Sequence, residues 1–349
     1  MLDTSAIADN QLKEPNLRDL APLFFGLHIA GGHVGLPLLV LTCLLSKKVK
    51  RHPTIINFCL TWIIYSVSYS LLLYGRNYKD SHPPQVLCFV QSAVIYATPS
   101  MAAVAAFAVV LQVYGTFYAI WDSESITKLP HAAKMLLMLA PPYITLATIS
   151  AGAGIIVWQH PDAVNAKNGI YCAIHVEAFE RYTVPLFCGL VLVFVSVLEA
   201  AVLVKIYRRR RYMKRVCPDA EVRRPSLGPW LRLAVFVAYS WVAIGACISF
   251  LTAPEFINPF PYMAQAALPL AAMIVFGTQE DVARVWLPWL WKSRDDMQVL
   301  ESRPPSISPR TSRTSGAHNL SNASDCDICR VPSGENEEGE AETQIAAVA

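Results

Sequence analysis

The stretch VLVKIYRRRRYMKRV, residues 202–216, changes from aliphatic to strongly basic within a few positions. Four consecutive arginines follow the apolar run, and Lys214 and Arg215 come close behind them. Taken alone, this pattern suits a nuclear localisation signal, a nucleic-acid patch, or the cytoplasmic edge of a membrane span. The rest of the chain has to decide between these three roles.

The chain as a whole is poor in charge. Of its 349 residues, 54% are hydrophobic and 16% are charged, whereas a soluble domain carries roughly 25% charged residues. Twelve of the 26 acidic residues lie at or beyond Glu280, and the basic residues cluster between apolar stretches. This distribution favours a membrane protein with a soluble tail over a nucleic-acid-binding protein, which would present a broad basic face.

Seven stretches are long and apolar enough to cross a bilayer, which takes about 20 residues for each helix. We expect them at 21–45, 54–74, 86–118, 134–158, 182–207, 232–253 and 260–278. Residues 1–20 have no apolar centre and do not read as a cleavable signal peptide. The predicted fold is therefore an all-α membrane protein: a seven-transmembrane helix bundle over residues 21–278, preceded by a short tail.

The orientation follows from the basic residues between the spans. Sixteen Lys and Arg residues fall on one side of the membrane and six on the other. Loops rich in Lys and Arg stay in the cytoplasm. We therefore expect a plasma-membrane protein with residues 1–20 outside and a cytoplasmic C-terminus, and the arginine run becomes the cytoplasmic end of the fifth span.

A short helix is predicted directly after the last span, over residues 279–292. Thr278 and Asp281 have the spacing of a capping box. The apolar face follows helical periodicity and carries tryptophans suited to a membrane interface. Its members are Val282, Val285, Trp286 and Trp289. We expect an amphipathic helix on the inner membrane surface; the alternative is an irregular juxtamembrane segment.

The last segment, residues 293–349, is polar and low in aromatic residues, so we expect a disordered cytoplasmic tail. Its hydroxyl residues lie near prolines and arginines and are candidate phosphorylation sites that a kinase or adaptor would read. These candidates are Ser308, Thr311, Ser312, Thr314 and Ser315. The alternative is an inert solvated tail. Cys326 and Cys329 form a single CxxC, which is too little for a zinc site.

Ionisable residues at membrane depth are costly and usually functional, and the spans contain few. Glu199 is the clear exception. We expect it to pair with Lys205 or Arg208 near the interface; the alternative is a polar switch inside the bundle. The seventh span has no lysine that could hold retinal as a Schiff base, so an opsin is excluded.

Catalytic chemistry is not indicated. A metal-dependent hydrolase would need clustered His and acidic ligands, yet His28 and His33 lie in the first span without an acid nearby. They are predicted to be packing residues beside Gly31 and Gly32. We expect no enzyme, no metal and no cofactor.

Two cysteines fall on the predicted outer side, where a disulfide would persist. Cys88 opens the third span and Cys172 lies between the fourth and fifth spans. A bond between them would tie this loop across the mouth of the bundle. The alternative is two free thiols, because other cysteines act as small apolar residues within spans. Those others are Cys43, Cys59, Cys188 and Cys247.

Together, the seven spans, the outer N-terminus, the Cys88 and Cys172 pair, the basic third cytoplasmic loop and the surface helix resemble the G-protein-coupled receptor superfamily over residues 21–292. The ending VFGTQED, residues 275–281, is similar to fungal receptors in particular. The DRY, CWxP and NPxxY sequences of rhodopsin-type receptors are absent. Their activation switches therefore cannot be carried over, and coupling is implied by architecture.

The resemblance implies a cell-surface receptor that senses an extracellular ligand and activates a heterotrimeric G protein. Polar and aromatic candidates for the ligand site near the outer leaflet are Gln91, Tyr96, Tyr182, Trp241, Tyr262 and Gln265. Each could instead belong to the aromatic interface belt or to helix packing. Candidates for G-protein contact are Arg208, Arg209, Arg210, Arg211, Lys214, Arg215, Arg223 and Arg224. These could also anchor the chain to anionic lipid.

A second function is compatible with the same topology. Spans almost free of charge would suit a facilitator or carrier of a neutral solute, or a structural membrane protein, without G-protein coupling. Carriers often show repeated halves, and we find no internal repeat in this sequence.

Overall fold

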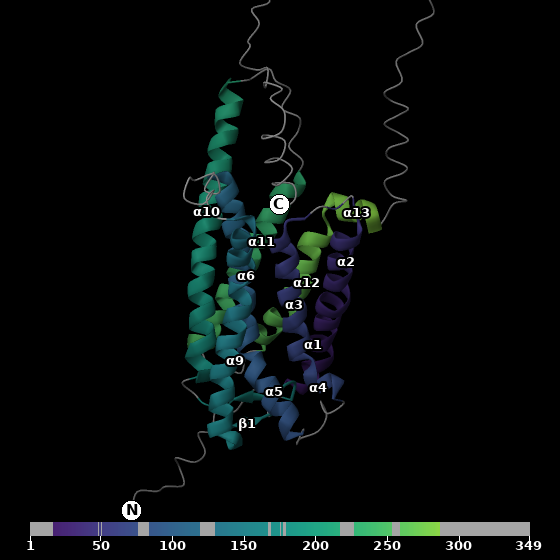
Figure 1. The fold of residues 1–349 in the computed structure, drawn as a ribbon, viewed down its shortest axis with the longest axis vertical. Helices are drawn as coiled ribbons and strands as arrows, with labels where there is room; N and C mark the ends of the chain where they lie inside the picture. Colours follow the sequence, from purple (N-terminus) through teal and green to yellow (C-terminus); the bar gives the residue numbers. More distant parts are fainter. Residues whose placement is uncertain are drawn as a thin grey trace, which may run out of the picture.

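A computed structural model shows the chain as an elongated bundle of helices that run alternately up and down its long axis (Figure 1). It describes residues 17–47, 49, 51–75, 84–118, 130–166, 169–174, 176, 179–216, 227–252 and 259–286. Residues 1–16 of the predicted N-terminal tail 1–20, the predicted tail 293–349 with its five phosphorylation candidates, Arg223 and Arg224 lie outside these residues.

The first half of the bundle consists of four helical columns, each interrupted once or more. The first column contains η1 (Arg18–Leu20), α1 (Ala21–His28), η2 (Ile29–Gly35) and α2 (Leu36–Leu45); the second contains α3 (Pro53–Tyr69) and α4 (Leu71–Tyr74); the third contains α5 (Gln85–Ile95) and α6 (Ala97–Phe117); the fourth contains α8 (His131–Leu139) and α9 (Pro141–Gln159).

A short connection and three further columns complete the described chain. The connection holds η4 (Pro161–Ala163) and an antiparallel pair of strands, β1 (Val164–Asn165) and β2 (Ala173–Ile174). The columns are η5 (Phe179–Thr183) with α10 (Val184–Val216), then α11 (Leu227–Thr252), then α12 (Phe260–Gly277), and the short α13 (Glu280–Trp286) follows.

Six helical columns of the described chain are long and apolar enough to cross a membrane, as in a multi-pass membrane protein. The column formed by α3 and α4 falls short of this measure, because α3 has only 17 residues and the helix breaks at Ser70. Eleven of the 17 residues of α3 are buried, including Asn57, Ser66 and Ser68. Its polar side chains thus face the bundle, and a seventh crossing stays a prediction.

The two ends of the bundle carry different features. The disulfide end, at the bottom of Figure 1, holds β1, α4 and the start of α5. The α13 end, at the top, holds α13 and the projecting part of α10. Helix α10 has 33 residues, about 50 Å at 1.5 Å per residue, against roughly 30 Å of bilayer hydrocarbon. The arginine run therefore lies within a helix that continues beyond the bundle.

Small residues set the closest helix contacts. Helix α6 is rich in alanine and packs against α3, α9 and α10. In η2, a Cβ added at Gly31 would lie 2.4 Å from the Leu270 backbone nitrogen of α12. A Cβ at Gly32 would lie 1.9 Å from the Ser66 Oγ of α3. Glycines thus let the π-helical turn η2 sit against two neighbours at backbone distance.

Candidate functional site: a cavity between five helices

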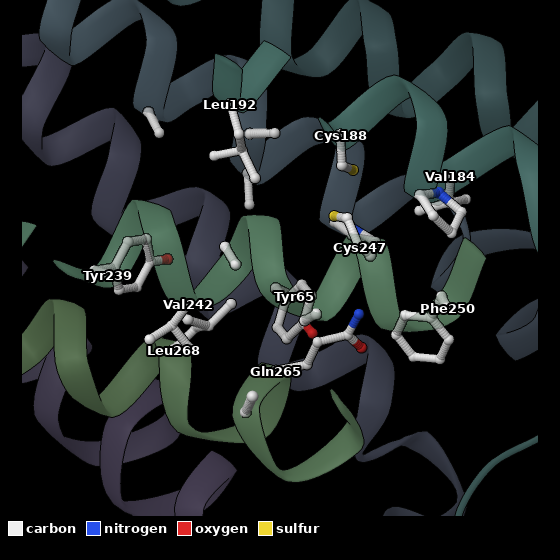
Figure 2. Close-up of a pocket in the computed structure, with 18 of the residues that line it drawn as sticks. Tyr65, Val184, Cys188, Leu192, Tyr239, Val242, Cys247, Phe250, Gln265 and Leu268 are labelled. Carbon is white, nitrogen blue, oxygen red and sulfur yellow. The ribbon is translucent and has the colours of Figure 1, made fainter. Parts of the chain in front are cut away.

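A cavity lies between α3, α6, α10, α11 and α12 (Figure 2). Its volume is about 60 Å³, which is room for several waters or a small organic group. Val184 and Pro185 open α10, Phe250 comes near the end of α11, and Gln265 lies early in α12. The cavity therefore begins in the half of the bundle nearest the disulfide end.

The walls of the cavity are apolar. Helix α6 contributes small side chains, α10 and α12 contribute Leu192 and Leu268, and α11 contributes Val242 and Ala246. Figure 2 shows Leu192, Val242 and Leu268 arranged around a common space, together with Cys188 and Cys247. Among the described residues that line it, none is acidic, basic or histidine.

Aromatic rings close the deep side of the cavity. The centre of the Trp62 ring lies 4.9 Å from the ring centre of Tyr65 and 6.0 Å from that of Tyr239, and both pairs pack edge to face. Trp62 and Tyr239 are buried, and neither the Trp62 Nε1 nor the Tyr239 hydroxyl has a hydrogen-bond partner within the described chain. Phe58 and Phe236 pack behind these rings. The Tyr65 hydroxyl also has no hydrogen-bond partner among the described residues. The floor thus combines close packing with three unsatisfied polar groups.

The residue after Tyr239 links α11 to α10. The Ser240 Oγ lies 3.1 Å from Glu199 Oε1 and 3.2 Å from the Phe236 carbonyl oxygen, and its one hydrogen serves these two acceptors. Glu199 is only 3% exposed. The second carboxylate oxygen, Oε2, has no hydrogen-bond partner among the described residues. A buried carboxylate held by one hydroxyl therefore lies at the helix interface just below the cavity floor.

The predicted pairing of Glu199 with Lys205 or Arg208 is wrong. The Lys205 Nζ donates to the Phe117 carbonyl and lies 3.9 Å above the Tyr118 ring, and Arg208 is exposed. The physical reason is helix geometry. At about 100° per residue, positions six and nine residues further on point to other faces of α10, whereas partners on one helix lie three or four residues apart.

Two of the predicted ligand residues hold the fold together. The Gln91 Nε2 donates to the carbonyls of Ser68 and Tyr69, and its Oε1 accepts from the Cys172 N–H at 3.1 Å. The Tyr96 hydroxyl donates to the Ile174 carbonyl and accepts from the Ile174 N–H. Both side chains therefore attach the β2 segment to α5 and its junction with α6.

The other four predicted ligand residues are placed differently from one another. Gln265 lines the cavity, and Tyr262 packs edge to face on the lining residue Phe250, with ring centres 5.4 Å apart. Tyr182 and Trp241 are 49% and 62% exposed. Of the six candidates, the structure brings Gln265 into the lining and Tyr262 next to it.

Sequence reasoning missed the residues that form the floor. Trp62, Tyr65 and Tyr239 were not among the candidates, although aromatic side chains with a polar atom usually find a partner when buried. Their positions in the middle of spans, away from the interface belt, are the one signal that could have singled them out.

A disulfide joins Cys88 of α5 to Cys172, with their Cα atoms 5.2 Å apart. With the Gln91 and Tyr96 hydrogen bonds, it fixes the connection before α10 across the disulfide end of the bundle. Among the described residues, Cys43, Cys59, Cys188 and Cys247 are free.

The histidines of the first column are packing residues, as predicted. His28 is fully buried and stacks on Tyr69, with ring centres 5.5 Å apart. Its Nδ1 lies 3.3 Å from the Ser66 Oγ. The His33 Nδ1 is 3.0 Å from the His28 carbonyl oxygen. No group of three metal-ligating side chains occurs within the described ranges.

At the α13 end, an ion pair fastens α13 to the loop after α2. The Arg51 Nη2 donates to both carboxylate oxygens of Asp281 at 2.5 Å. Burial lowers the pKa of Arg51, and the charge of Asp281 acts in the opposite direction. The Trp286 Nε1 donates to Thr42 Oγ1 at 2.8 Å.

The predicted helix after the last span is present over Glu280–Trp286, and residues 287–292, with Trp289, lie outside the described chain. Its apolar face does not lie free on a surface. Val282 is fully buried, and Trp286 is half-buried against α2. The short helix is therefore docked on its own bundle.

Arg208 and Arg211 are exposed on the projecting part of α10, beside the exposed Tyr207 and Tyr212. The remaining candidates of this helix occupy the same stretch of backbone; they are Arg209, Arg210, Lys214 and Arg215. This part of α10 thus presents positive charge with aromatic rings at the α13 end.

Comparison with protein-family models gives no match, and comparison with curated proteins finds no significant relative, so the function has to be argued from the geometry of the site.

Proposed function

We propose that this chain is a seven-span membrane receptor that binds a small ligand in the cavity and activates a heterotrimeric G protein. One observation carries the proposal: Tyr239 lines the cavity, and the adjacent Ser240 bonds to Glu199 of α10. The same helix α10 continues to the arginines at the α13 end. The cavity, the interface of α10 with α11 and the basic end of α10 thus follow one another along the same two helices.

The orientation of the receptor is part of the proposal. The excess of Lys and Arg at the α13 end supports a cytoplasmic location for that end. The Cys88–Cys172 disulfide supports an oxidising, extracellular location for the opposite end. In this arrangement the ligand enters from outside, and α3 with α4 forms the remaining crossing.

Transmission would use the interface between α10 and α11. A ligand shifts an equilibrium only by binding one state better than the other. Contact with Tyr239 acts one residue away from Ser240, whose hydroxyl bonds to Glu199. A small rotation of α11 would exchange that bond for another partner and move the basic end of α10.

The test is guanine-nucleotide exchange on G-protein α subunits from the same host, with membranes that contain the chain. Reversing the charge of both exposed arginines, Arg208→Glu with Arg211→Glu, should lower exchange at least about tenfold, since these contacts are charge-assisted. The matched control is Arg208→Lys with Arg211→Lys, which keeps the charge. Equal exchange by all three proteins at equal surface level would refute the G-protein contact.

A carrier of a neutral solute is the second candidate, because the cavity has an apolar lining without a charged side chain among the described residues. Solute uptake by vesicles separates the two functions. Uptake that survives Arg208→Glu with Arg211→Glu, together with no nucleotide exchange by the unaltered chain, would favour the carrier.

A further inference from the structure

We propose that the cavity selects an uncharged, mainly hydrocarbon molecule with one hydrogen-bond acceptor, such as a ketone or ester carbonyl. Trp62 and Tyr239 would donate to this acceptor. The inference names the ligand class of the proposed function, and it rests on that function only in taking the cavity as the ligand site.

The hydrocarbon part of the ligand follows from the walls. Ala102, Ala103 and Ala106 form one side, and aliphatic residues such as Leu192 and Leu268 form others. Apolar surface moved from water into such a space is stabilised in proportion to the area that is buried. Ligand cavities of this kind bind mainly through hydrocarbon contact and use a few polar groups to fix orientation.

The acceptor follows from two unsatisfied donors of the floor, which belong to Trp62 and Tyr239. Trp62 is 4% exposed and Tyr239 is 8% exposed. The Trp62 Nε1 and the Tyr239 hydroxyl have no hydrogen-bond partner in the described chain. Native proteins pair almost all buried polar atoms, so each exception calls for a partner. The indole N–H can only donate, which requires an acceptor on the ligand.

One oxygen could serve both donors. They come from two helices, α3 and α11, and their rings meet edge to face at 6.0 Å. A carbonyl oxygen has two lone pairs and can accept two hydrogen bonds. A single carbonyl on an otherwise apolar molecule would therefore satisfy both of these donors.

The absence of charge follows from the lining. An ion that leaves water for an apolar cavity needs an opposite charge or several hydrogen bonds. None of the described lining residues is ionised. Glu199 is close to the floor but does not line the cavity, and its Oε1 is bound to Ser240. Carboxylates and ammonium compounds should therefore be rejected.

The experiment compares four three-carbon probes, small enough for the cavity, on the full chain in lipid nanodiscs: propanone, propane, propanoate and propylammonium. Binding is measured as the concentration-dependent rise of the thermal unfolding midpoint. We expect the ketone to bind about three- to tenfold more tightly than propane, which is the effect of about one hydrogen bond. Propanoate and propylammonium should give no rise.

Two variants remove one donor each: Tyr239→Phe keeps the ring, and Trp62→Phe replaces the indole with a smaller phenyl ring. Each should lower the preference for the ketone over propane. Tyr239→Phe should leave propane binding unchanged, whereas Trp62→Phe adds space to the cavity, so only the ratio of ketone to propane binding is compared for it. The matched controls are Trp241→Phe and Tyr207→Phe, whose rings are 62% exposed and do not line the cavity. They should leave every probe unaffected and also report any effect of probe dissolved in the lipid.

The inference is overturned if both variants retain the full ketone preference, or if a charged probe binds best. Its failure can be told from failure of the receptor proposal in the same nanodiscs. Nucleotide exchange that depends on Arg208 and Arg211, with no ketone preference, would reject the ligand class alone. Ketone binding that depends on Trp62 and Tyr239, without nucleotide exchange, would support the ligand site and refute activation of a G protein.

Discussion

Two buried ionisable side chains, Arg51 and Glu199, have unequal sets of partners in this molecule. The Arg51 side chain is 3% exposed, and its Nη2 donates to both carboxylate oxygens of Asp281. This ion pair is a clamp that attaches α13 to the bundle. Glu199 accepts one hydrogen bond from Ser240 and leaves a second oxygen unpaired within the described chain. The α13 end is therefore held by a fully paired carboxylate, whereas the carboxyl group at the interface of α10 and α11 has one oxygen without a partner in the described chain.

The difference agrees with the roles proposed for the two regions. A receptor needs a fixed frame and a movable element that has two arrangements of similar free energy. The ion pair with the Trp286–Thr42 bond provides the frame, and the Ser240–Glu199 bond provides the movable contact.

The largest expected effect comes from breaking the clamp. Asp281→Ala leaves the buried Arg51 guanidinium without this carboxylate and should cost about 3 kcal/mol of unfolding free energy. Denaturant unfolding in detergent measures the loss. Asp162→Ala, at an exposed acid of η4, is the control and should have no effect. A loss at Asp281 equal to that at Asp162 would show that the pair is not a clamp.

The close contact between η2 and α12 is tested next, by substitution of two glycines. Gly31→Ala places a Cβ 2.4 Å from the Leu270 nitrogen and should destabilise the chain by about 1–3 kcal/mol. Gly152→Ala in α9 meets nothing within 4 Å and should stabilise the helix by up to about 1 kcal/mol. If both substitutions shifted the unfolding midpoint in the same direction, the close contact of Gly31 with α12 would be contradicted.

The movable contact should respond more weakly. Ser240→Ala removes the hydrogen bond to the buried carboxyl group of Glu199 and leaves its Oε1 without this donor, so we expect a loss of about 2 kcal/mol. Glu199→Gln keeps an acceptor for Ser240 and removes the buried ionisable group, so stability should stay level or rise. Basal nucleotide exchange measured on both variants sharpens the comparison: it should rise in Ser240→Ala, where this link between α11 and α10 is lost, and stay level in Glu199→Gln, where it is kept.

The smallest effect is expected at the edge of the clamp. Trp286→Phe loses the hydrogen bond to Thr42 and should cost about 1 kcal/mol. Trp241→Phe, on the outer face of α11, should change the midpoint by less than the error of the measurement. A larger loss at Trp241 than at Trp286 would show that α13 contributes little to the frame.

Much of the fold was predictable because it depends on local composition. Apolar length predicts the helices, and the two cysteines before the third and fifth spans predict the link at one end. The arginine run predicts a helix end, although the helix continues to Val216. The site was less predictable from the sequence. Gln91 and Tyr96 hold β2 and the residues before it in place, and of the six candidates Gln265 alone lines the cavity.

The sequence by itself determined which segments are apolar helices and where the basic residues gather, because transfer from water depends on residue composition along the chain. Only the tertiary structure decided which face of each helix meets which neighbour. The rotation of α10 turns Glu199 to Ser240, and the crossing of α3 with α11 brings Trp62 to Tyr239. These contacts depend on packing between segments far apart in the chain, which no local pattern encodes.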